Sequence, residues 1–160
     1  MKDVTIYSDG ACIGNPGPGG YGAVLLYQQH RREYSGGYRQ TTNNRMELMG
    51  AIRALEALRE PCSVTLYSDS QYVVQALDQG WAERWRSNGW KRTKRKAAIN
   101  PDLWDRMLKL CEKHLVTVEW VRGHAGNPEN ERCDRLANDA ARRADLAVDT
   151  GYESVSHESA

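Results

Sequence analysis

Hydrophobic and polar residues alternate along the first quarter of the chain. Alternation with a period of two is typical of half-buried strands. It predicts strands over residues 4–8, 21–28 and 32–38, and the first of these meets a turn at Asp9 and Gly10. Residues 14–20 are rich in glycine and proline and are expected to form a loop. The chain therefore begins with an antiparallel meander.

The pattern changes to a helical period from residue 43 to residue 58. Leu48, Ile52 and Leu55 fall on one helical face there, and Pro61 follows the end of the helix. Beyond this point we expect strands over residues 63–68 and 116–121, and helices over residues 71–79, 81–89, 102–114 and 128–144. A meander followed by alternating strands and helices predicts an α/β fold, with a mixed sheet and helices on its faces.

Length and composition favour one globular domain. The 160 residues, 40% of them apolar, are enough to bury a core. We expect a single domain over residues 1–152 and a short, disordered polar tail over residues 153–160. No segment has the apolar length of a membrane span or the form of a cleavable leader. Four cysteines far apart, without a CxxC pair, favour reduced thiols in a cytoplasmic protein.

The distribution of charge is more informative than the net charge of +1. Between Arg86 and Lys96, six of eleven residues are basic and none is acidic. A solvated loop would tolerate such a run, but Trp90 beside it favours a patch for a nucleic-acid backbone. The basic residues singled out are Lys91, Arg92, Lys94, Arg95 and Lys96.

Residues 17–22 match the dinucleotide-binding pattern GxGxxG letter for letter. In that motif the glycines open a helix whose N-terminus meets a pyrophosphate. Here they lead into Ala-Val-Leu-Leu-Tyr, which is strand-like. We therefore interpret the segment as a hairpin rich in positive-φ positions rather than a nucleotide site.

Two near-identical strands each lead to an aspartate: Thr-Ile-Tyr-Ser precedes Asp9, and Thr-Leu-Tyr-Ser precedes Asp69. If these strands are parallel neighbours, about 4.8 Å apart, both carboxylates lie at one edge of the sheet. Two bare carboxylates would repel by roughly 3 kcal/mol at about 5 Å and an effective dielectric of about 20. A divalent cation removes this repulsion. Either aspartate alone is equally suited to capping a turn or a helix, but the duplication favours a metal site.

Three further residues are candidates for the same chemistry. Glu47 belongs to an apparent capping box that starts at Asn44, but a first-turn glutamate near a sheet edge can also face a metal. Asp134 lies early in the last predicted helix, where its charge would also suit the helix dipole. His124, on the loop after the last strand, is either a solvated residue or a proton carrier at the mouth of an acidic site.

Four segments together resemble bacterial type 1 ribonuclease H. They are Tyr-Ser-Asp-Gly-Ala-Cys (7–12) with the glycine-rich segment 14–22, Thr-Thr-Asn-Asn-Arg-Met-Glu-Leu (41–48), Ser-Asp-Ser-Gln-Tyr (68–72), and Gly-His-Ala-Gly (123–126) with Asn-Glu-Arg-Cys-Asp (130–134). They occur in the family's order, and the likeness runs from about residue 3 to Tyr152. The departures, such as Asn127 where some relatives have histidine, spare the carboxylates.

The resemblance implies a ribonuclease H-like fold with a five-stranded sheet in the order 3-2-1-4-5. It also implies an endoribonuclease that hydrolyses the RNA strand of an RNA–DNA hybrid and leaves 5′-phosphate and 3′-hydroxyl ends. Asp9, Glu47, Asp69 and Asp134 would hold two Mg²⁺ ions, for which Mn²⁺ can substitute, and His124 would assist. The partner would be the hybrid duplex, bound by a monomer without a membrane or an obligate protein partner.

Substrate-binding residues also follow from the resemblance. The 2′-hydroxyls that distinguish RNA from DNA would be read in the minor groove by Gly10, Cys12, Asn15, Asn43, Glu47 and Gln71. Thr42, with Asn15 and Asn100, would hold a DNA phosphate. Asn43 and Asn44 are equally suited to helix capping. At least one of Trp81 and Trp85 would support the DNA sugars, although tryptophans at this spacing are more often core, as we expect for Trp104 and Trp120.

Two other interpretations compete. A resolvase- or transposase-type nuclease of the same fold would use a similar acidic cluster, but it gives no reason for the glycine-rich loop, Asn43, Asn44 and Gln71 to match together. A non-catalytic hybrid-binding module would lack at least one metal ligand, and none of the four is missing.

Overall fold

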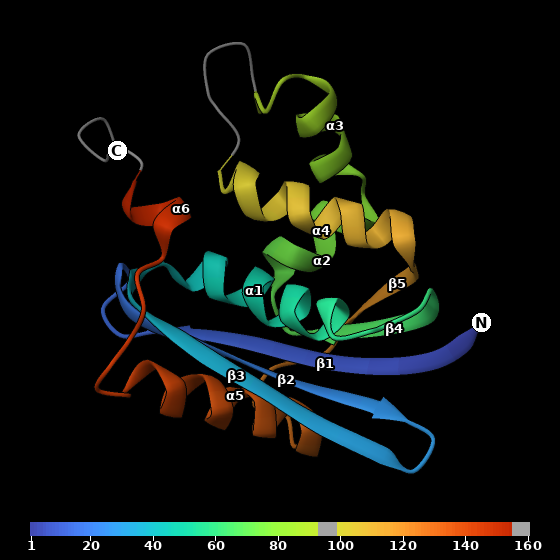
Figure 1. Ribbon diagram of the computed structural model, residues 1–160, viewed down its shortest axis with the longest axis horizontal. Helices are drawn as coiled ribbons and strands as arrows, with labels where there is room; N and C mark the ends of the chain where they lie inside the picture. Colours follow the sequence, from blue (N-terminus) through green and yellow to red (C-terminus); the bar gives the residue numbers. More distant parts are fainter. Residues whose placement is uncertain (93–98, 155–160) are drawn as a thin grey trace.

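A five-stranded mixed sheet forms the centre of the molecule (Figure 1). The computed structural model describes residues 1–92 and 99–154. Lys94, Arg95, Lys96 and the tail from residue 155 lie outside the described residues. The strands are β1 (Lys2–Cys12), β2 (Gly17–Tyr27), β3 (His30–Thr41), β4 (Cys62–Ser68) and β5 (Leu115–Trp120).

The strand order is β3-β2-β1-β4-β5, which confirms the predicted fold. β1 and β4 are parallel neighbours, and Thr5 lies opposite Thr65 and Tyr7 opposite Tyr67. The repeated sequence thus pairs with itself in register. The predicted turn at Asp9 is wrong, because the backbone beyond Asp9 keeps pairing with β2 as far as Cys12. Asp9 therefore lies inside a strand, whereas Asp69 directly follows one.

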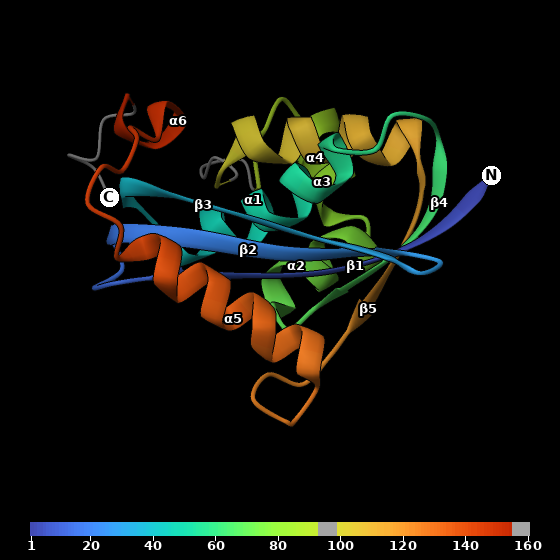
Figure 2. The same cartoon turned by 60° about the horizontal axis from the view of Figure 1, so that its bottom comes forward.

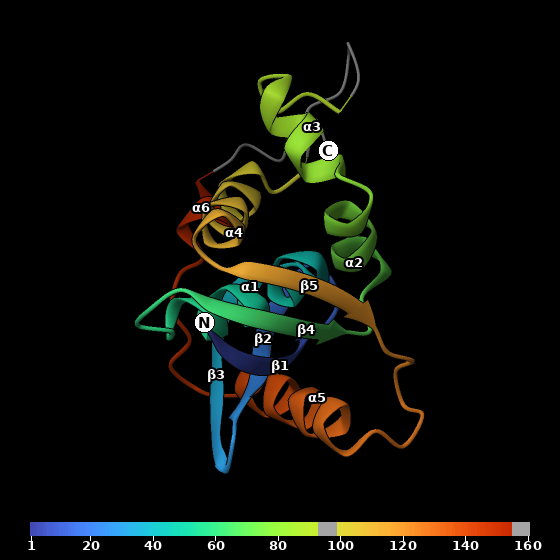
Figure 3. The ribbon, with the colours of Figure 1, turned by 90° about the vertical axis from the view of Figure 1, so that its right-hand side faces the viewer.

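Helices cover both faces of the sheet, as Figures 2 and 3 show. They are α1 (Asn43–Glu56), α2 (Gln71–Asp78), α3 (Trp81–Ser87), α4 (Pro101–Lys113), α5 (Pro128–Ala141) and α6 (Thr150–Glu153). α5 packs alone on one face, against β1, β2 and β3, and the group formed by α1, α2 and α4 lies on the other. α6 was not expected, because its four residues are too few to show a helical period.

The main core lies between the sheet and α1. Ile6 and Leu66 from the strands meet Leu48, Ile52 and Leu55 from α1, and all five are fully buried. Burial of one such side chain stabilises the fold by about 1.5–3 kcal/mol. These residues confirm the predicted helical face.

Trp104 and Trp120 differ in their environments. Trp104 is fully buried on α4, as expected, and it packs edge-on against Trp85. Trp120 is 47% exposed, so its assignment to the core was wrong. It ends β5, an edge strand beyond the part of the sheet that α5 covers.

The glycine-rich segment is a strand packed against a helix. β2 begins at Gly17, so the expected loop is shorter than residues 14–20. A Cβ on Gly20 would lie 2.2 Å from the carbonyl oxygen of Ala137, and one on Gly22 would lie 2.5 Å from that of Cys133. Of the glycines between residues 14 and 22, only Gly14 has a positive φ, of 67°. The hairpin is confirmed, but it is not rich in positive φ: close contact with α5 explains Gly20 and Gly22, and Gly17 and Gly19 lie close to Ile13 and Thr41.

Arg45 joins three separate segments of the chain. Its guanidinium is 3% exposed, and its Nε donates to Asp149 Oδ2 at 2.8 Å while its Nη2 donates to Asp102 Oδ2 at 2.7 Å. Nη1 and Nη2 make second bonds to the same two carboxylates, so both pairs are bidentate. Thr41 adds a hydroxyl bond to Asp149 at 2.7 Å. The starts of α1 and α4 are thereby tied to the segment that leads into α6.

We expect Arg45→Ala to lower the free energy of unfolding by about 3–5 kcal/mol, because it leaves the buried Asp149 carboxylate without its cation. Lys2→Ala is the control, because its ion pair with Glu60 is about half exposed and solvent screening should leave it little effect on stability. Urea unfolding at constant m-value measures both. A loss for Arg45→Ala no larger than for Lys2→Ala would show that the ion pairs do not hold these segments together.

Candidate active site

Three carboxylates from different elements meet at one place. Asp9 comes from within β1, Glu47 from the start of α1, and Asp69 from the end of β4. One oxygen of each lies within 4.8 Å of the others. Gly10 makes this approach possible, because a Cβ there would lie 2.4 Å from the backbone nitrogen of Glu47. α1 can therefore cross directly over β1 and bring Glu47 to the aspartates.

Asp9 and Glu47 are buried, Asp69 is partly exposed, and the cluster is electrostatically strained. Burial, and then the charge of Asp69, raise the pKa of Asp9 from its ordinary value of 3.8 to about 8, despite a bond from the Gly10 amide at 2.9 Å. Burial and the charge of Asp9 likewise raise the pKa of Glu47 well above its usual range. Glu47 Oε2 is a buried acceptor without a hydrogen-bond partner. Oxygen donors with an unsatisfied lone pair fit a hard divalent cation such as Mg²⁺.

The capping interpretations of these residues were wrong. Thr42 caps α1, since its hydroxyl accepts from the Arg45 amide at 3.3 Å, so neither Asn43 nor Asn44 is the cap. Glu47 does not close a capping box but joins the cluster. The cap of α2 is Ser70 and not Asp69.

Asp134 lies beside the cluster rather than inside it. It is the seventh of the 14 residues of α5, too far along for the expected benefit from the helix dipole. Its charge still contributes to the raised pKa of Asp9. Its Oδ1 accepts a bond from Asn138 Nδ2 at 3.2 Å. It is thus a fourth carboxylate near the same centre.

His124 lies in the loop between β5 and α5. It is exposed, with a φ of 56°. The loop rests on the acidic cluster at the neighbouring Gly123, where a Cβ would lie 2.8 Å from Asp69 Oδ2. This contact places the loop at the cluster, as the sequence predicted.

Several proposed substrate-binding residues gather around the start of α1. Asn15 Oδ1 accepts from the Asn43 amide at 3.0 Å, which ties the β1–β2 loop to the helix. The Cys12 thiol lies 3.4 Å from the carbonyl oxygen of Thr41, just before Thr42. Asn100 Oδ1 accepts from Arg45 Nη1 at 3.3 Å. These contacts bring Cys12, Asn15, Thr42, Asn43 and Asn100 to one end of the molecule.

Trp81 and Trp85 line a hollow of about 460 Å³ between α2 and α3. Both are half-buried, so each has a face toward the core and a face toward the hollow. Tyr72, Arg84, Asn88 and Arg92 complete the lining, and Lys91 beside them is exposed. The sequence reasoning missed Tyr72 and Arg84 here. Tyr72 follows Gln71, an exposed residue at the start of α2, in a motif already singled out.

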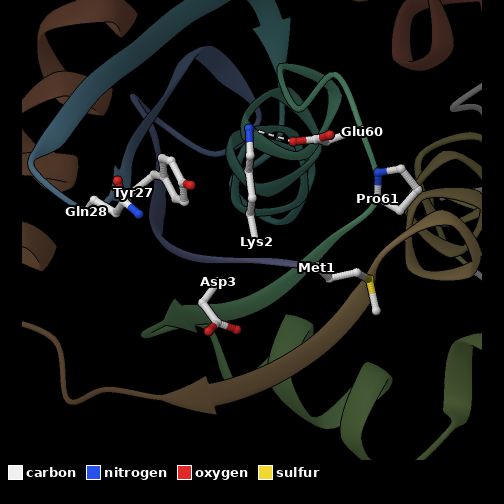
Figure 4. A pocket seen from close by; sticks show the side chains of 7 residues that line it. All are labelled: Met1, Lys2, Asp3, Tyr27, Gln28, Glu60 and Pro61. Carbon is white, nitrogen blue, oxygen red and sulfur yellow. Dashed lines mark ion pairs between the residues drawn. The ribbon is translucent and has the colours of Figure 1, made fainter.

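A second hollow, of about 580 Å³, lies elsewhere (Figure 4). It surrounds the start of β1 and is lined by Met1, Lys2, Asp3, Tyr27, Gln28, Glu60 and Pro61. Lys2 is seven residues before Asp9, or roughly 23 Å at about 3.3 Å per strand residue. This hollow is therefore separate from the carboxylate cluster, and its volume says nothing about the cluster.

The comparisons with known proteins agree with this geometry. The RNase H family model matches residues 1–142. The chain belongs to the ribonuclease H family. It is 67% identical to a ribonuclease H from Syntrophus aciditrophicus (strain SB), over 95% of this chain and 88% of the relative. It is 62% identical to one from Desulforamulus reducens, over 93% and 94%.

Solved ribonuclease H structures have the same fold. LC9-RNase H1, described as a type 1 RNase H with the type 2 active-site motif, has a TM-score of 0.77 at 35% identity, covering 88% of this chain and 72% of that one. LC11-RNase H1 in complex with an RNA/DNA hybrid has a TM-score of 0.66 at 26% identity, covering 86% and 96%. The resemblance inferred from the four motifs is confirmed.

Family membership makes the chain an enzyme, an endonuclease that hydrolyses RNA in RNA–DNA hybrids. Ribonucleases H depend on metal ions, and the described residues include one cluster of acidic side chains that is suited to hold a metal ion. Among the same residues, no helix is long and apolar enough to cross a membrane.

The raised pKa of Asp9 predicts how pH changes stability without metal. Because the folded state keeps a proton that the unfolded state has lost, Asp9 should make the fold less stable as pH rises from about 4 to about 8. Asp9→Asn removes this loss and keeps the oxygen that accepts from Gly10. In EDTA at pH 8 the variant should be more stable than the wild type by about 1 kcal/mol or more. Thermal melts across this range measure the difference, and equal pH slopes would contradict the strained cluster.

Proposed function

We propose that Asp9, Glu47, Asp69 and Asp134 bind two Mg²⁺ ions, with Mn²⁺ as a substitute, and that this site cuts the RNA strand of a hybrid. The single observation that carries the proposal is the group of three close carboxylates, two of them buried, with the Oε2 of Glu47 unpartnered among the described residues. Like charges this close are unfavourable without a cation. Asp134 supplies a further negative charge beside the group.

When bound, two divalent ions would supply the activation of a water molecule and the stabilisation of the leaving 3′ oxygen, for products with 5′-phosphate and 3′-hydroxyl ends. The chain would hold them with Asp9 from β1, Asp69 directly after β4, Glu47 from α1 and Asp134 from α5. His124 lies outside the carboxylate group on an exposed loop, where it can exchange protons with solvent. We assign it to proton transfer near the leaving group rather than to metal binding.

The substrate lies across the ends of α1 and α3 in this proposal. Gly10, Cys12, Asn15, Asn43, Asn44 and Gln71 would contact the RNA strand and its 2′-hydroxyls. Thr42 and Asn100 would hold a DNA phosphate, and the hollow at Trp81 and Trp85 would receive DNA sugars. Lys91, Arg92, Lys94, Arg95 and Lys96 would neutralise the backbone. Support comes from the similar fold of LC11-RNase H1, whose structure contains a hybrid.

We further propose one catalytic domain over residues 1–152 that acts as a cytoplasmic monomer without an obligate protein partner. Support for a monomer is that the carboxylate group comes from a single chain. Support for the cytoplasm is that all four cysteines are free thiols.

Asp9→Asn, Glu47→Gln and Asp69→Asn should each abolish measurable cleavage of an end-labelled hybrid in Mg²⁺ while hybrid binding persists. Each removes a charge that holds the metal but no packing. Asp139→Asn, on the exposed side of α5, is the matched control and should keep its turnover. More than a tenth of wild-type turnover in Asp9→Asn or Asp69→Asn would contradict the assignment of these residues as metal ligands. Cleavage of duplex DNA as fast as hybrid would favour a resolvase-type nuclease.

The basic segment should control binding through salt. Replacing Lys91, Arg92, Lys94, Arg95 and Lys96 with alanine should weaken binding most at low salt. It should lower the slope of log affinity against log salt by roughly 2–3 units if about three residues contact phosphate. KM should rise while kcat barely changes, equally for hybrids of different sequence. Arg135→Ala with Arg142→Ala is the control, because Arg135 lies on α5 and Arg142 directly follows it, across the sheet from α3. An unchanged slope in the five-alanine variant would make the run a solvated loop.

A further inference from the structure

Two residues from the segment that follows β5 lie against one oxygen of Asp69. Asn130 Nδ2 donates to Asp69 Oδ2 at 3.3 Å. Gly123 lies against the same oxygen, where a Cβ would be only 2.8 Å away. Asp69 itself directly follows β4, the neighbouring strand. One segment therefore encloses a carboxylate oxygen that lies more than 50 residues earlier in the sequence.

Asn130 is placed firmly for this contact. It is 2% exposed and is the third residue of α5. The backbone amide of Asn130 donates to Oδ1 of the capping residue Asn127 at 3.0 Å, so the start of α5 fixes the backbone of Asn130. A carboxylate only accepts, so the amide group of Asn130 must turn its NH₂ toward Asp69. A buried amide is unfavourable unless it is hydrogen-bonded, and Asp69 supplies that bond.

Gly123 contributes by its lack of a side chain. It is not among the residues with a positive φ, so any residue would suit its backbone conformation. There is no room for a side chain at this position. A Cβ added to Gly123 would lie 2.8 Å from Oδ2 and 3.4 Å from Cγ of Asp69. His124 is the next residue. The position of the loop that carries His124 thus depends on the position of the Asp69 carboxylate.

We propose that Asn130 and Gly123 are positioning residues that fix the rotation of the Asp69 carboxylate and couple the His124 loop to the metal site. We call this pair the Asp69 clamp. Neither residue contacts the reacting atoms. The inference rests on the proposed function, because it takes Asp69 as a metal ligand. Partners that hydrogen-bond to a ligand typically change metal affinity by about 10- to 100-fold when they are removed.

The test measures Mg²⁺ binding as well as cleavage. Calorimetric titration of Mg²⁺ into the protein should show affinity about 10-fold weaker in Asn130→Ala and in Gly123→Ala. The milder Asn130→Ser, which keeps a hydroxyl donor, should lie between them and the wild type. Asp139→Asn, on the exposed side of the same helix, does not touch Asp69 or the start of α5, so it should bind Mg²⁺ as the wild type does. Each variant is first shown to unfold cooperatively.

A double-mutant cycle tests the coupling to the loop. His124→Ala alone should slow turnover by about 10- to 100-fold. If the clamp positions the loop, His124→Ala should slow turnover at least 3-fold less in the Asn130→Ala background than in the wild type. Additive effects would contradict the coupling.

The failure of the clamp is distinguishable from the failure of the metal site. If Asp69→Asn loses Mg²⁺ binding and cleavage while both clamp variants bind Mg²⁺ within 2-fold of the wild type, the clamp is wrong and the proposed function stands. If Asp69→Asn keeps both, the metal-site assignment is wrong, and the clamp fails with it.

Discussion

The parallel, in-register pairing of β1 with β4 is the contact on which the rest of the site depends. It brings Asp9 and Asp69 to adjacent strands at the same level, because their preceding residues pair one to one. The ladder of hydrogen bonds fixes both backbones up to Ser8 and Ser68, so the two repelling carboxylates that follow are held close together. Clustering the carboxylates raises the pKa values of Asp9 and Glu47 and destabilises the folded state. Burial of apolar side chains along the same strands offsets this free-energy cost.

The second constraint is the approach of α1 to β1. Gly10 leaves room for the helix to lie on the strand beside Asp9, and so Glu47 reaches the aspartates. Arg45, two residues earlier, anchors the same helix start to Asp102 and Asp149. The segment before α6 is therefore linked to the end of the sheet where the acidic cluster lies. Arg45, which forms the ion pairs, and Glu47, which belongs to the strained cluster, therefore lie within one turn of α1.

The proposed substrate-binding residues have different structural origins. Around α1, backbone turns and short polar side chains face one end of the sheet, whereas α3 offers half-buried tryptophans and arginine. Two strands of a hybrid differ in their 2′-hydroxyls, so two chemically different surfaces at a fixed separation suit it. The family relation to proteins named ribonuclease H agrees with that arrangement.

The sequence by itself predicted the strands, the helical face of α1 and the closeness of Asp9 to Asp69, because periodicity and the repeated strand are local properties. By resemblance it also proposed roles for Glu47, His124 and Asp134. Only the tertiary structure decided which of several local roles each residue takes. Thr42 rather than its neighbours caps α1, β1 continues through Asp9, and Trp120 is exposed at an edge. The Asp69 clamp and the Arg45 anchor join residues 54 to 104 positions apart, and such contacts leave no periodic trace because they arise only when distant segments pack.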